Sequence, residues 1–140
     1  MGLCTSDCTD PNHRSIETHP SLIFTVVINP ASGPGSSLLP DANYTREVTK
    51  LNTYSNVRPI GYVPVDYGRR SIDASAADIA HYSKWAQANP ALQMQGIFLD
   101  ESPRNADNHN ASYVATVKNI LSSTPNIGDS RLNKPPFVGQ

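Results

Sequence analysis

Two adjacent carboxylates, Asp100 and Glu101, follow directly after an apolar segment at residues 96–99. Such a segment is typical of a buried strand, which would deliver both acids to its carboxyl end. Like charges that are held close together and shielded from water raise one carboxyl pKa, so one group would stay protonated beside an ionised partner. Glycosidases use a protonated carboxylic acid of this kind to protonate the leaving oxygen. The pair is therefore a candidate for glycoside chemistry.

Whether the two acids share one site depends on local geometry. Side chains alternate along an extended strand, so Asp100 and Glu101 point the same way only if the chain turns between them. Ser102 and Pro103 follow at once and favour such a turn. The alternative is that the acidic pair only begins a solvated loop.

Several residues near the same region could contact a ligand. Tyr62 and Tyr67 are candidates for stacking on a sugar ring, and we expect the loop residue Tyr67 to make the better contact. Arg70 could bind an anion, or it could simply begin a surface helix. The single tryptophan, Trp85, lies next to the apolar face of a helical segment, and we assign it to packing.

Other chemistries find little support in the sequence. The loop at residues 33–37 (GPGSS) resembles a phosphate cradle, but its proline removes one of the amide donors that such loops need. The two cysteines and the nearby histidines do not have the ligand spacing of a zinc finger: Cys4, Cys8, His13 and His19. We therefore expect neither a metal nor a cofactor.

The elements that must position these residues alternate along the chain. Three segments have strand character and three have helical periodicity, in alternating order: residues 22–28, 57–63 and 95–99 for the strands, and 41–51, 71–88 and 108–122 for the helices. This order predicts a parallel α/β sheet with right-handed crossovers. Ligands of such sheets bind beyond the carboxyl ends of the strands. In this chain those ends are Asn29, residues 63–67 and residues 100–102.

Length and composition restrict the domain organisation. The chain has 140 residues and a net charge of −1, which gives no support to binding of nucleic acid or of an acidic membrane. No apolar run approaches the roughly 20 residues of a membrane span, and the N-terminus lacks the pattern of a signal peptide. We expect residues 1–20 to be a polar leader without regular structure, residues 21–123 to form the folded domain, and residues 124–140 to be a disordered tail.

Three ordered motifs resemble the spherulin-4-like family of fungi, slime moulds and bacteria: residues 27–35 (VINPASGPG), 61–70 (GYVPVDYGRR) and 96–101 (GIFLDE). The resemblance covers about residues 16–120. It implies a (β/α)8 TIM barrel and a glycoside hydrolase that cuts α-1,4-linked N-acetylgalactosamine in galactosaminogalactan, a cell-surface polysaccharide. The family's acidic pair falls on Asp100 and Glu101. The cleft-lining residues that the resemblance implies are Asn29, Tyr62, Tyr67 and Arg70.

The length of the chain conflicts with a complete barrel. A full barrel takes about 250 residues, whereas this sequence predicts a βαβαβα segment. We therefore expect a partial (β/α)8 barrel, a fragment of a spherulin-4-type hydrolase, with open sheet edges that would allow self-association. The resemblance also implies a secreted or cell-surface protein. The alternative function is carbohydrate binding without catalysis, or another cell-surface role.

Overall fold

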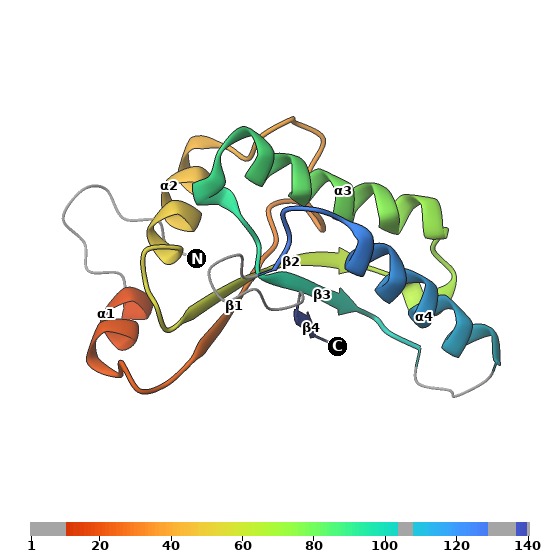
Figure 1. The fold of residues 1–140 in the computed structure, drawn as a ribbon, viewed down its shortest axis with the longest axis horizontal. Helices are drawn as coiled ribbons and strands as arrows, with labels where there is room; N and C mark the ends of the chain where they lie inside the picture. Colours follow the sequence, from red (N-terminus) through yellow and green to blue (C-terminus); the bar gives the residue numbers. More distant parts are fainter. Residues whose placement is uncertain (1–10, 104–107, 129–136, 140) are drawn as a thin grey trace.

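The computed structural model describes residues 11–103, 108–128 and 137–139 of the chain. Four strands and four α-helices alternate in it, together with two short 3₁₀ turns (Figure 1). The strands are β1 (Phe24–Ile28), β2 (Val57–Pro64), β3 (Gly96–Asp100) and β4 (Phe137–Gly139). The helices are α1 (Pro11–Thr18), α2 (Ala42–Leu51), α3 (Ile72–Ala88) and α4 (Asn108–Ser123), and the 3₁₀ turns are η1 (Asp66–Gly68) and η2 (Pro90–Leu92).

The sheet has the order β1-β2-β3-β4, and every pair of neighbouring strands is parallel. Consecutive strands are therefore neighbours, with a helix in each of the three connections between them, as in a (β/α)8 barrel. The prediction of a parallel βαβαβα segment of such a barrel is confirmed. No helix within the described residues is long and apolar enough to cross a membrane.

Local signals place α2 and α3 where the sequence predicts them. Asp41 caps α2, because its side chain accepts a hydrogen bond from the amide of Tyr44. Ser71 caps α3 in the same way, and that helix ends before Pro90. β2 includes Pro59, whose carbonyl accepts a hydrogen bond from the amide of Gln95. Gln95 lies one residue before the start of β3. The missing N–H of Pro59 therefore faces the chain just before β3 begins, so few hydrogen bonds of the sheet are lost.

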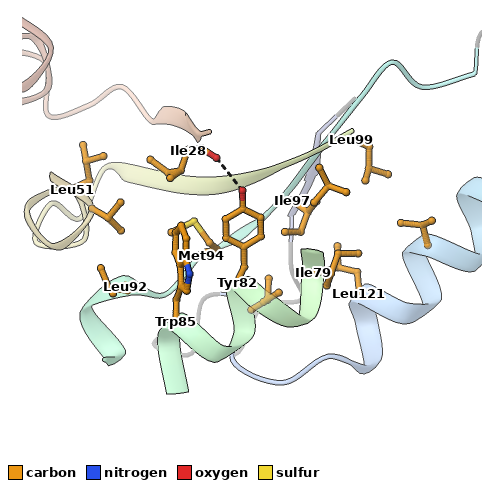
Figure 2. Close-up of a cluster of buried hydrophobic side chains, with 14 of the residues drawn as sticks. Ile28, Leu51, Ile79, Tyr82, Trp85, Leu92, Met94, Ile97, Leu99 and Leu121 are labelled. Atoms are coloured by element: carbon orange, nitrogen blue, oxygen red, sulfur yellow. Dashed lines mark hydrogen bonds between the residues drawn. The ribbon is translucent and has the colours of Figure 1, made fainter. Parts of the chain in front are cut away.

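The core lies between the sheet and the helices that cover one of its faces (Figure 1). Figure 2 shows side chains of β1 and β3 packed against those of α3 and α4. Tyr82 and Trp85 of α3 are both fully buried, and their ring centroids lie 4.9 Å apart with the planes near a right angle. The assignment of Trp85 to packing is confirmed.

Two parts of the predicted domain organisation need correction. Residues 11–18 were expected within an unstructured leader, but they form α1, which buries Ile16 and His13 against the domain. Asn56 fixes the end of this segment by donating from Nδ2 to the carbonyls of Ile16, His19 and Leu22, at 3.1–3.3 Å.

The other correction concerns the chain after residue 123. The expected disordered tail contains Ile127, which is buried and bridges to Met94, and strand β4, which pairs with β3. Long-range pairing of this kind leaves little trace in local sequence. Residues 1–10, 129–136 and 140 of the predicted leader and tail lie outside the described part of the chain.

Candidate functional site

Asp100 is the last residue of β3, and its carboxylate is held from two sides. The hydroxyl of Tyr62 donates to Oδ2 at 2.6 Å, and the backbone amide of Glu101 donates to Oδ1 at 2.8 Å. Tyr62 lies on the neighbouring strand β2, opposite Phe98 in the sheet register, and their rings stack at a centroid distance of 6.3 Å. The hydrogen bond to Asp100, followed by burial, raises the pKa of Tyr62 to about 12. The phenol is therefore a firmly protonated donor to the acid at neutral pH.

Glu101 lies where the chain turns away from β3. Its φ is +56°, in the left-handed region that a residue with a β-carbon seldom adopts. This is the turn that the sequence required if the two acids were to share a site. The residue is exposed, and its side chain has no hydrogen-bond partner among the described residues. The two acids thus have different environments: Asp100 is fixed and Glu101 faces solvent.

The loop after β2 is joined to these acids through its backbone. The amide of Val65 donates to the carbonyl of Asp100 at 3.0 Å, and the amide of Tyr67 donates to the carbonyl of Glu101 at 2.7 Å. Tyr67 itself is 46% exposed. Together these contacts bring Tyr62, Tyr67 and the acidic pair into one continuous group at the carboxyl edge of the sheet.

Asn29 begins the loop after β1 and stabilises that loop. Its Oδ1 accepts from the amide of Gly33 at 3.0 Å, and its carbonyl accepts from the hydroxyl of Tyr44 on α2 at 3.2 Å. Asn29 therefore lies at the predicted edge. Its side chain is exposed, but its Oδ1 already accepts a hydrogen bond within the same turn. Among the described residues, no hydrogen bond links it to the acidic pair.

Arg70 is held by the protein itself. Its Nη1 donates to the carbonyl of Pro64 at 3.0 Å and to Oδ2 of Asp78 on α3 at 2.7 Å. Both side chains are largely buried, with 26% and 19% of their surfaces exposed. A β-carbon at Gly33 would lie 3.3 Å from the same Asp78 oxygen, so the first edge loop packs against this ion pair. The arrangement joins the first two edge loops to α3.

Sequence reasoning missed two residues that support the site. Nothing in the chain distinguishes Asp78 from any other polar residue of α3. Tyr82 lies within the helix predicted at residues 71–88, and its buried hydroxyl donates to the carbonyl of Tyr62 at 2.8 Å. It also donates to the carbonyl of Ile28 at 3.3 Å (Figure 2). Burial raises the pKa of Tyr82 well above its usual value. The available sequence signal was an aromatic residue at helical spacing among apolar ones. Such spacing does not show which carbonyls its hydroxyl will bond.

Strained backbone is concentrated at this edge. Five residues other than glycine have positive φ among those described, and four of them lie in the three loops that follow β1, β2 and β3: Ser32, Asp66, Tyr67 and Glu101. Each such conformation costs on the order of 1–3 kcal/mol and persists only where the surroundings impose it. Strain of this kind is common where side chains are held for function, which agrees with the position predicted from strand order.

The candidate metal ligands of the sequence do not come together in the described structure. His13 Nε2 bonds to Oε2 of Glu47 at 2.9 Å, and His19 Nδ1 lies 3.0 Å from the carbonyl of Ser15. Cys4 and Cys8 lie outside the described residues. Across residues 11–103, 108–128 and 137–139, no group of three potential ligands is placed to hold a metal ion.

Comparison with known proteins now places the chain in a family. Residues 7–135 match the model of spherulation-specific family 4, and the chain belongs to that family. It is 41% identical over 107 residues to spherulin-4 of Physarum polycephalum. The aligned region covers 76% of this chain and 30% of that protein.

A solved structure extends the similarity to three dimensions. The crystal structure of Aspergillus clavatus Sph3 in complex with GalNAc matches with a TM-score of 0.83 and 40% sequence identity. The match covers 91% of this chain and 49% of that one, so the chain spans about half the length of this neighbour and less than a third of spherulin-4. The predicted family resemblance is confirmed.

Proposed function

We propose that this chain carries part of the active site of a glycoside hydrolase that acts on N-acetylgalactosamine-containing cell-surface polysaccharide. The observation that carries the proposal is the acidic pair. Asp100 is fixed by Tyr62 and by a backbone amide, while Glu101 is exposed beside it. Support comes from the family of the chain and from its similarity to Sph3, whose crystal structure contains GalNAc.

The different environments of the two acids suggest different roles. Asp100 accepts two hydrogen bonds that fix its side chain, and a carboxylate fixed in this way can stabilise the positive charge that develops on a sugar ring. Glu101 is free to approach the glycosidic oxygen, and we propose it as the proton donor. In this proposal, the hydroxyl of Tyr62 keeps Asp100 oriented toward the substrate.

The remaining predicted residues take different parts in the proposal. Tyr67, exposed and bonded to Glu101 through its backbone, would contact the sugar. Asn29 would line the edge beside it. Arg70, predicted as a substrate contact, would act through the loops that it joins, because its Nη1 already donates to Asp78 and to the carbonyl of Pro64. Secretion or display at the cell surface, and self-association through the open sheet edges, stay predictions.

Turnover of α-1,4-linked N-acetylgalactosamine oligosaccharides, measured by the release of new reducing ends, tests the proposal. We expect Asp100→Asn and Glu101→Gln each to lower the rate by about 100-fold or more. Asp73→Asn, which removes an exposed carboxylate from the first turn of α3, is the matched control and should keep the rate. If the wild-type chain cleaves the oligosaccharide and the double variant of the acidic pair cleaves it equally well, the proposal is wrong.

One observation favours a second candidate, carbohydrate binding without catalysis. Both carboxylate oxygens of Asp100 are already bonded within the protein, as expected of a group that holds a fixed geometry. In this case the wild-type chain would bind the oligosaccharide without cleaving it. Neutralising the two acids would leave its affinity within about twofold, whereas replacing Tyr67 would weaken it.

A further inference from the structure

The sequence contains two acceptor triplets for N-glycosylation, at residues 43–45 (NYT) and 110–112 (NAS). Both triplets lie in the first turn of a helix, the first in α2 and the second in α4. Such triplets also arise by chance, so the surroundings of each asparagine decide whether the folded chain has room for a sugar. The two surroundings differ.

Asn43 lies on the solvent face of α2. Arg46 and Lys50 follow it at helical spacing and are also exposed. The buried residues of this helix are Val48 and Leu51, which form a different face. The side chain of Asn43 is exposed and has no hydrogen-bond partner among the described residues. A large hydrophilic group attached to it would extend into solvent without displacing a contact of the protein.

Asn110 lies on the side of α4 that packs against the domain. Tyr113, one turn later on the same side, is buried, and its hydroxyl lies 3.0 Å from Oγ of Ser75 on α3. Asn110 itself is half-buried, and its Oδ1 lies 3.1 Å from the position that a β-carbon on Gly68 would take. A sugar on this amide would crowd the contact between α4 and the loop after β2.

An exposed apolar segment precedes the first triplet. Leu38 and Leu39 are 69% and 39% exposed. The end of this segment is fixed to the first turn of α2, because the hydroxyl of Thr45 donates to the carbonyl of Pro40 at 3.2 Å. Contiguous apolar surface of this kind favours association between molecules when it stays uncovered. A glycan on Asn43 would be attached to the same turn, where it could cover the two leucines.

We propose that Asn43 is the N-glycosylated residue of this chain, that its glycan shields Leu38 and Leu39, and that Asn110 stays unmodified. The co-substrate is a lipid-linked diphospho-oligosaccharide of the secretory pathway. Nδ2 of Asn43 forms a bond to the anomeric carbon, the bond from that carbon to the diphosphate oxygen breaks, and the amide loses one proton as the lipid diphosphate leaves.

The order of modification and folding explains the selectivity. The hydroxyl of Thr45, which the acceptor triplet requires, is bonded to Pro40 in the folded chain, so the transfer precedes the closure of this turn. A chain that receives a sugar on Asn110 cannot pack α4 against the loop after β2, so the folded protein carries the sugar on Asn43 alone. This inference rests on the predicted secretion and not on the proposed hydrolase activity.

Expression of the full chain behind a secretion leader in yeast tests the inference. Endoglycosidase treatment leaves one N-acetylglucosamine on each modified asparagine, and peptide mass spectrometry of the folded, monodisperse protein then locates it. We expect this sugar on Asn43 alone. Asn43→Gln and Thr45→Ala should both lose it completely, while Asn110→Gln, the matched control, should keep it. A sugar on Asn110, or none on Asn43, would overturn the assignment.

The shielding role has a separate measurement. Removing the glycan from the purified wild-type chain should raise the fluorescence of an added apolar dye (ANS), because Leu38 and Leu39 become uncovered. In Leu38→Ser most of this rise should be lost. Unchanged fluorescence in the wild type, or an equal rise in Leu38→Ser, would overturn the shielding role. None of these results depends on cleavage of an oligosaccharide, so the proposed function stands or fails separately.

Discussion

Gly61 has no space for a side chain, and this gives a sharp test of how the site is supported. A β-carbon at Gly61 would lie 2.7–2.8 Å from three ring atoms of Tyr82. The ring cannot easily withdraw, because it is fully buried, its hydroxyl bonds to two carbonyls, and Trp85 packs against it. We therefore predict that Gly61→Ala destabilises the protein.

The magnitude follows from two opposing effects. Overpacking a rigid core costs about 1–3 kcal/mol, and the fixed ring places this site near 3. Replacing glycine by alanine in a strand recovers about 0.5–1 kcal/mol, because the unfolded chain has less freedom to lose. The expected net loss is about 2 kcal/mol, which corresponds to a decrease of about 5–8 °C in Tm for a chain of this size.

Urea unfolding followed by the fluorescence of Trp85 measures this loss. The matched background is Tyr82→Leu, in which the smaller side chain leaves space for the new methyl group. In that background Gly61→Ala should cost less than about 0.5 kcal/mol, so the two changes should be strongly coupled. A cost for Gly61→Ala below about 0.5 kcal/mol in the wild type, or an equal cost in both backgrounds, would refute the reasoning.

Three further predictions concern the edge and its supports. Asp78→Asn should lower the free energy of unfolding by about 2 kcal/mol, because it removes the negative charge from a largely buried ion pair and leaves the guanidinium without its counter-charge. The exposed Asp66→Asn should leave the urea midpoint nearly unchanged, and equal effects would argue against the buried pair. The raised pKa of Tyr62 stabilises the fold below pH 10, and this contribution is lost as the pH rises toward about 12. In Asp100→Asn the phenol should titrate closer to 10 by ¹³C NMR, and an unchanged titration would contradict the assigned hydrogen bond. Asn56→Ala should speed tryptic cleavage at the arginine within α1, because the three bonds that anchor this segment are lost, and unchanged cleavage would show that other contacts suffice.

Features set by local sequence were predictable. The uncharged, largely β-branched run of β1, the cap at Asp41 and the stop before Pro90 each depend on a few neighbouring residues. Strand order then placed the acidic pair at the carboxyl edge, since parallel strands present their ends on one side. The turn at Glu101 also followed from Ser102 and the proline after it.

Features set by contacts distant in the sequence could not be predicted. The hydroxyl of Tyr82 reaches a carbonyl 54 residues away, and the anchor of α1 is Asn56, between 34 and 40 residues from its acceptors. Arg70 was predicted from its charge as a ligand contact, but the position of Asp78 on the facing helix decides where its guanidinium points. Such pairings depend on how the elements pack, which one sequence does not specify.

The central prediction is that a sugar binds at the edge formed by Tyr62, Asp100 and Glu101. Titrating the ¹⁵N-labelled chain with GalNAc and following amide shifts by NMR tests this most directly. We predict the largest shifts at residues 62–68 and 99–102, with loss of these shifts in the double variant Asp100→Asn, Glu101→Gln. Shifts confined to the opposite edge near Asn56, or the absence of any shift, would contradict this prediction.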